Sequence, residues 1–141
     1  MRHAFLLLAA LIALPAADED TRQHATLPAP AQETLRQEML DNLFALNEIV
    51  TLLAENKVKE AGEVAENKLG RGVMGRHMQL PFEARPGPNM PPEMHRLGMD
   101  GHFADSDFAK AAASGKRDAA MKKLPALMGS CVACHASYRI R

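Results

Sequence analysis

Apolar residues recur at steps of three and four positions along most of this chain, and that period predicts amphipathic helices. The first helix is expected from about Gln32 to Asn56, with an apolar stripe made of Leu35, Met39, Leu43, Leu46, Val50 and Leu53. A second is expected from about Lys57 to Leu69, with one apolar side made of Val58, Ala61, Ala65 and Leu69. The short junction between the two predicts an antiparallel pair.

The helical pattern stops at Gly70, because residues 70–92 contain five prolines and four glycines. We expect a long crossover there and then a third helix, from about Pro92 to Ser114, with an inward stripe made of Leu97, Gly101, Ala104, Phe108 and Ala111. Asp118 is the expected N-cap of a fourth helix, which carries Met121, Leu124, Leu127, Met128, Cys131, Cys134, His135 and Tyr138. Pro125 should kink this helix or mark its late start.

The pattern contains no strand-like alternation and no internal repeat, so the expected fold class is all-α. Four helices of this size predict a four-helix bundle over residues 32–141. Residues 18–31 are polar and contain proline, and we expect them to form a mobile arm that leads into the fold.

The first 17 residues have the pattern of a signal peptide. A short basic segment precedes the uninterrupted apolar run from Ala4 to Leu14, and small residues at 15–17 precede the acidic residues 18–20. The run is too short to span a bilayer as a mature helix, although an uncleaved membrane anchor is the alternative. We therefore expect export to the periplasm and no membrane attachment after cleavage.

Composition narrows the class of partner. The 141 residues contain 17 Lys and Arg and 17 Asp and Glu, and removing residues 1–17 takes away only Arg2. The mature chain is therefore close to neutral and lacks the basic excess expected of a nucleic-acid-binding protein.

The only two cysteines lie near the end of the chain in the segment Cys131-Val132-Ala133-Cys134-His135, which is the attachment signature of a c-type haem. On a helix the two thiols and the imidazole fall at i, i+3 and i+4, so one face presents all three groups. The cysteines can then hold one covalent haem c, and His135 can bind its iron from the proximal side. A zinc site would need a second Cys or His pair, and a redox dithiol would need a βαβ context. Covalent haem c is made outside the bacterial cytoplasm, so the motif and the signal peptide predict one another.

A C-terminal CxxCH motif that continues into Tyr138 and Arg139, on the fourth helix of a small exported protein, resembles the class II c-type cytochromes, the cytochrome c′ family. The resemblance covers about Gln32 to Arg141, and the long crossover and Pro125 depart from it. It implies that Arg139, after the aromatic Tyr138, lies close to the haem on its proximal side. It also implies that the first helix lines the distal face near Met39, and that the protein can form a homodimer.

The expected function is that of a one-electron carrier, and the alternative function differs from it at the sixth position of the iron. A thioether ligand from Met39 predicts a one-electron carrier that serves redox partner proteins. If Leu40 or Leu43 shields an open position instead, a five-coordinate haem would bind nitric oxide or carbon monoxide. A weaker alternative is a copper site among the Met and His residues at positions 74–102. No residue set resembles a substrate-turning active site, so we expect a protein that is not an enzyme.

Overall fold

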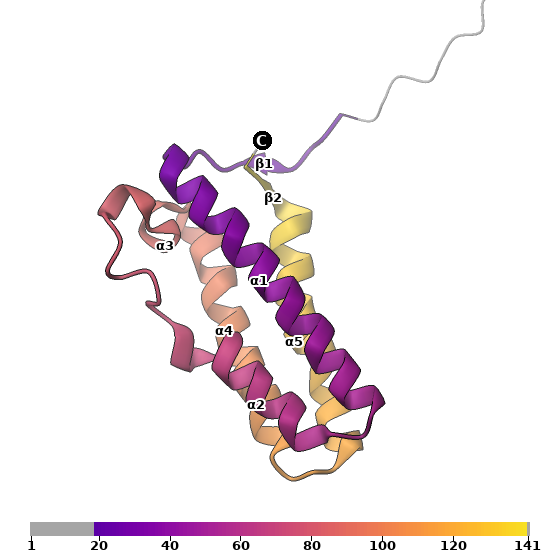
Figure 1. Cartoon of the computed structure of the whole chain (residues 1–141). Helices are drawn as coiled ribbons and strands as arrows, with labels where there is room; N and C mark the ends of the chain where they lie inside the picture. Colours follow the sequence, from indigo (N-terminus) through magenta and orange to yellow (C-terminus); the bar gives the residue numbers. More distant parts are fainter. Residues whose placement is uncertain (1–18, 141) are drawn as a thin grey trace, which may run out of the picture.

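The computed structural model describes residues 19–140, and the predicted signal peptide lies outside them. The chain is mostly helical, which confirms the all-α prediction (Figure 1). The four longer helices are α1 (Ala29–Ala54), α2 (Val58–Lys68), α4 (Pro92–Ala112) and α5 (Arg117–Ser137). The crossover contains the short helices η1 (Arg71–Val73), η2 (Phe82–Ala84) and α3 (Pro86–Asn89). Two-residue strands β1 (Gln23–His24) and β2 (Tyr138–Arg139) pair in parallel.

The longer helices pack in a chain of neighbours. Helix α1 packs on α2, α2 on α4, and α4 on α5, whereas α1 and α5 are not a closely packed pair. Figure 1 shows the course of these helices. Asn56 makes the turn between α1 and α2 with a φ of 60°, and Gly115 makes the turn between α4 and α5 with a φ of 70°. Both turns use residue types that tolerate the left-handed region. None of the described helices is both long and apolar enough to cross a membrane.

One hydrophobic core lies near these two turns, and we call it the turn-end core. It joins all four longer helices, and its largest fully buried side chains are Ile49, Phe108 and Leu127. The apolar side predicted for the second helix is confirmed, because Val58, Ala61, Ala65 and Leu69 all lie in this core.

A second, smaller core lies near the chain termini, and we call it the termini-end core. Its buried members are Ala25, Leu27, Ala31, Leu35 and Met94, and Cys134, Tyr138 and Ile140 pack against it. It therefore brings the start of the described chain, the first turns of α1 and α4, and the Cys-His segment together.

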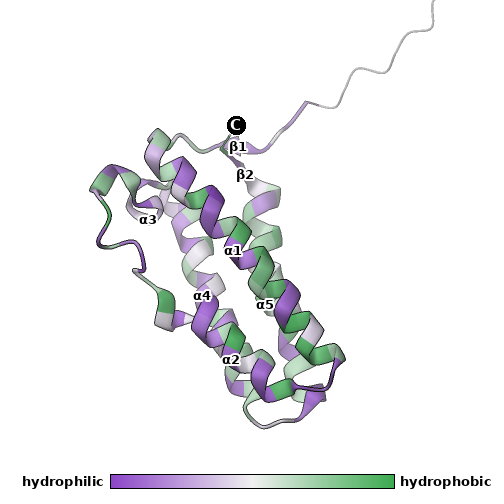
Figure 2. Ribbon diagram, in the orientation of Figure 1, coloured by the Kyte–Doolittle hydropathy of each residue, from purple (hydrophilic) through white to green (hydrophobic). Residues whose placement is uncertain are grey.

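The structure corrects the predicted stripe of the first helix. Leu35 and Leu53 are buried as expected, but Met39, Leu43 and Val50 are 36%, 61% and 46% exposed. The buried face of α1 instead comprises Ala31, Leu35, Ala45, Ile49 and Leu53. Figure 2 shows why periodicity misplaced the stripe, because hydrophobic positions occur on several sides of α1.

Two details of the later helices also differ from expectation. In α4 the buried face includes Asp105 and Ala112 together with the expected Gly101 and Phe108. Helix α5 begins at Arg117, so Lys116 is its N-cap and Asp118 lies in its first turn. The helix runs through Pro125, which rules out a late start at that residue.

Residues 23–31, expected to be part of a mobile arm, instead belong to the packed fold. Ala25 and Leu27 are buried, and the Ala25 backbone N–H donates to the Arg139 carbonyl at 2.8 Å. Helix α1 already begins at Ala29. The segment ahead of the first helix is thus held by the last residues of the chain.

Candidate functional site

The two cysteines and His135 lie in the last turns of α5, as the motif requires. Both cysteines are free; Cys131 is exposed and Cys134 is half-buried. His135 is exposed, four positions after Cys131 on the same helix. The spacing therefore presents two thiols and an imidazole from one helical face that nearby protein leaves accessible.

The environment of the thiols disfavours a redox dithiol. Although Cys131 is exposed as a residue, desolvation around its sulfur raises the pKa of its thiol. Burial also raises the pKa of Cys134. Reactive dithiols have lowered pKa values, because the thiolate is the nucleophile. Both groups are thus protonated thiols at neutral pH.

A layer between the two cores lacks buried side chains, and we call it the middle layer. No residue of α1 from 36 to 44 is buried, and no residue of α5 from 128 to 137 is buried. In α4 only Gly101 is buried between Met94 and Asp105. Protein interiors normally pack without such gaps. The middle layer is therefore an interruption of the core at the level of the Cys-His motif.

Gly98 marks the same interruption on α4. It lies four residues after Met94 and three before Gly101, so it belongs to the buried face of that helix. Nevertheless it is exposed, and apart from the adjoining chain of its own helix no atom lies within 4 Å of the position that its Cβ would take. A Cβ at Gly101 would lie 3.0 Å from the Ser130 hydroxyl oxygen, so the next turn of α4 already meets α5.

Helix α1 borders this layer with exposed apolar side chains and with one buried polar atom that lacks a hydrogen-bond partner within residues 19–140. Met39 and Leu43 are exposed there, and Leu40 is exposed one position beyond Met39. Asn42 lies on the buried side of the helix, three residues before Ala45, and its buried Oδ1 has no hydrogen-bond partner among the described residues. The helix thus offers both predicted kinds of distal residue, a thioether and leucine side chains.

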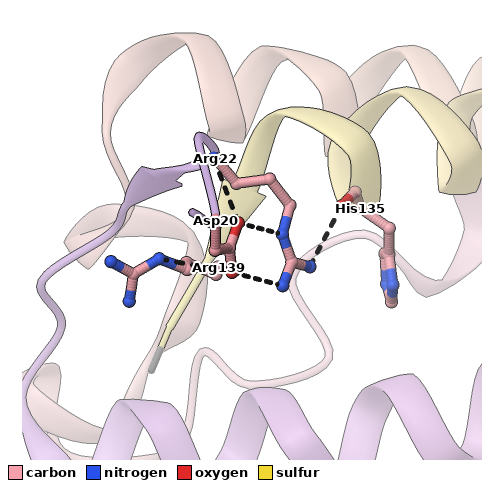
Figure 3. Close-up of polar contacts among 4 residues, drawn as sticks. All are labelled: Asp20, Arg22, His135 and Arg139. Atoms are coloured by element: carbon pink, nitrogen blue, oxygen red, sulfur yellow. Dashed lines mark hydrogen bonds and ion pairs between the residues drawn. The ribbon is translucent and has the colours of Figure 1, made fainter. Parts of the chain in front are cut away.

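The C-terminal end of the motif is hydrogen-bonded to the N-terminal segment. Arg22 Nη1 donates to the His135 carbonyl oxygen at 3.3 Å, and the Asp20 carboxylate accepts from Arg22 Nε at 2.9 Å and from Nη2 at 2.8 Å (Figure 3). Arg139 Nε lies 3.6 Å from Asp20 Oδ2, too far for a hydrogen bond, and has no other partner among residues 19–140. Figure 3 shows the His135 ring pointing away from this cluster.

Asp105 is a residue of this region that the sequence did not reveal. Asp105 is only 8% exposed and lies on the buried face of α4. Burial, followed by the negative charge of Glu66, raises the pKa of Asp105 to about 7. The same carboxyl contributes to the raised pKa of the Cys131 thiol. An acidic residue within an apolar stripe is read from sequence as an outward-facing one, which is why it was missed.

Two of the histidines of positions 74–102 contact different parts of the fold. His77 Nε2 lies 3.3 Å from Glu38 Oε2, although its geometry falls short of a hydrogen bond, and His102 Nδ1 meets the Leu69 carbonyl. Within the described part of the chain, no three His, Cys, Asp or Glu side chains gather closely enough to hold a metal ion.

Comparison with protein-family profiles, with curated proteins and with solved structures finds no match.

Proposed function

We propose that this protein is a periplasmic, class II type monohaem c-type cytochrome that carries single electrons between redox partner proteins. In this proposal the four longer helices form a four-helix bundle, with one haem c attached to α5 through Cys131 and Cys134. The observation that carries the proposal is the middle layer, because the core is interrupted where the CxxCH motif presents its thiols and imidazole.

The residues around that layer suit a large, flat, apolar group with a polar edge. Met39 and Leu43 offer apolar side chains from α1, and Gly98 leaves space beside α4. A porphyrin would remove these side chains from water, which is favourable at about 25 cal/mol per Å² of apolar surface. The proposal therefore explains why apolar residues are exposed next to the motif.

The chain's own groups have distinct roles in this proposal. Cys131 and Cys134 provide the thioether links, and His135 provides the proximal imidazole. Met39 is the proposed distal ligand, and Tyr138 and Arg139 support the proximal side. When bound, the haem supplies a one-electron ferric–ferrous couple whose potential a Met thioether raises. Because both proposed ligands stay in place on reduction, little rearrangement accompanies each transfer.

Intact mass and optical spectra of the exported protein test attachment and ligation together. We expect a mass increase of one haem that survives denaturation and that the double variant Cys131→Ser, Cys134→Ser abolishes. A chain that lacks covalent haem after export into a haem-attaching periplasm would refute the proposal.

Met39→Ala tests the carrier function. We expect the wild-type oxidised spectrum to show the weak thioether-to-iron charge-transfer band, and Met39→Ala to abolish it. Met78→Ala is the control, because Met78 is a well-exposed methionine of the crossover. A broad high-spin wild-type spectrum that changes with carbon monoxide would replace the carrier by the gas-binding alternative, with Leu40 or Leu43 beside an open iron.

A further inference from the structure

His135 lies at the end of α5, where backbone carbonyl oxygens lack hydrogen-bond donors within the helix. The last four carbonyl oxygens of a helix lack intrahelical donors, and helix ends fray for that reason. His135 lies in this last turn, since α5 ends at Ser137. The Tyr138 backbone N–H donates to the Cys134 carbonyl. The His135 carbonyl would be left to water without Arg22.

The N-terminal segment supplies the missing donor. Arg22 Nη1 reaches the His135 carbonyl across 113 residues of sequence. Asp20 fixes the guanidinium through two side-chain hydrogen bonds, and its Oδ1 also accepts from the Arg22 backbone N–H at 3.1 Å. Arg22 and Asp20 also form an ion pair, with 2.8 Å between Nη2 and Oδ2. A cation at a helix C-terminus also interacts favourably with the helix dipole.

The same segment holds the chain beyond His135. Strand β1 pairs with β2, with Gln23 opposite Tyr138 and His24 opposite Arg139. Just after β1, Ala25 and Leu27 are buried in the termini-end core, against which Cys134, Tyr138 and Ile140 pack. Residues 20–27 therefore contact the chain at His135 and at Tyr138 and Arg139 beyond it, and they share a core with Cys134.

From this geometry we infer that residues 20–27 form a clamp that positions the proximal histidine, with Asp20 and Arg22 as positioning residues. The inference rests on the proposed function for the role of His135, but the contacts themselves do not. The clamp limits the freedom of the last turn of α5 and thereby fixes the direction of the imidazole. A histidine held in this way would bind the haem iron in one fixed orientation. The electron density that the imidazole gives to the iron is one of the protein's means of setting a haem potential.

Two variants of opposite charge separate positioning from simple electrostatics. Arg22→Met removes a positive charge but keeps the side-chain stem, and Asp20→Asn removes a negative charge. If the clamp positions His135, both variants loosen the imidazole, weaken its donation to ferric iron and raise the midpoint potential. If the two residues act only through their charges, Arg22→Met lowers the potential and Asp20→Asn raises it. Opposite shifts would overturn the inference.

Amide hydrogen exchange provides a readout that does not depend on haem. We expect exchange at Tyr138 and Ala25 to become about fivefold faster in Arg22→Met, the change expected for one lost hydrogen bond. Arg96→Met is the matched control, because Arg96 makes two carboxylate contacts on α4, at 2.9 Å to Glu93 and 2.8 Å to Asp100. That control should leave both amides and the potential unchanged.

The two proposals fail in different ways. Absence of covalent haem by intact mass refutes the proposed function, and accelerated exchange would then describe a clamp with no ligand to position. A normal haem content with unchanged exchange and potential in both variants refutes the clamp and leaves the proposed function standing.

Discussion

The turn-end core and the middle layer differ in how the same helices fill space. Near the turns, Ile49, Phe108 and Leu127 are fully buried and four helices share one core. In the middle layer, no residue of α1 from 36 to 44 and no residue of α5 from 128 to 137 is buried, and Gly98 faces open space. The chain's own side chains therefore close one region and leave the other open, and the proposed haem would fill the open region.

This difference indicates that the two regions have different roles. The turn-end core holds the helices in place by side-chain packing, so it should keep its structure whether or not a cofactor is bound. The middle layer exposes apolar side chains at a cost that only burial against another group would offset. Variants in each region should therefore respond differently to the presence of haem.

The largest loss of stability should come from a substitution in the turn-end core. Phe108→Ala removes a fully buried ring, and we expect a loss of about 3–5 kcal/mol in the free energy of unfolding because of lost burial and the cavity left behind. Chemical denaturation of the proteins with and without haem measures it, and the loss should be similar in both.

Phe103→Ala is the control on the same helix. Phe103 is exposed, and its ring centroid lies 5.7 Å from the Arg71 guanidinium. We expect a loss of no more than about 1 kcal/mol. Equal losses for Phe103 and Phe108 would contradict the contrast between core and surface.

Local spacing made the motif and the α2 face predictable from the sequence. Cys131, Cys134 and His135 need only one helix to converge, and α2 has apolar residues on one side alone. By contrast, α1 carries Leu40, Phe44 and Val50 on several sides, so its period could not distinguish a core-facing stripe from one bordering a gap. The β1–β2 pairing joins two-residue segments from opposite ends of the chain, and such short segments have no periodic signal.

A smaller effect, and one that depends on pH, should come from Asp105. Its pKa is raised from 3.8 to about 7 in the folded protein, so the folded state binds the proton more tightly than the unfolded state. Stability therefore falls as pH rises from about 4 to about 7. Asp105→Asn has no carboxyl to ionise. We expect its free energy of unfolding to exceed that of the wild type by on the order of 2 kcal/mol at pH 8 and by little at pH 4.

Denaturation at pH 4, 6 and 8 measures this gain. Asp107→Asn is the control, because Asp107 is an exposed carboxylate on the same helix, and it should change stability by less than about 0.5 kcal/mol. A gain of equal size at every pH would show that ionisation of Asp105 is not its cause.

The smallest change in stability, that of Gly98→Ala, tests most directly whether the middle layer is filled by haem. Gly98 and Gly129 are both helical glycines, and apart from the adjoining chain of its own helix neither has an atom within 4 Å of the position that an added Cβ would take. In the protein without haem, each substitution to alanine should therefore raise the free energy of unfolding by about 0.5–1 kcal/mol, because it reduces the freedom of the unfolded chain. Only Gly98 lies on the buried face of its helix, between Met94 and Gly101. With haem bound, Gly129→Ala should keep its gain, whereas Gly98→Ala should lose it because the new methyl group competes with haem for the same space. If Gly98→Ala gains equally in both forms, the open space beside α4 is not where the cofactor lies, and the middle layer would need another explanation.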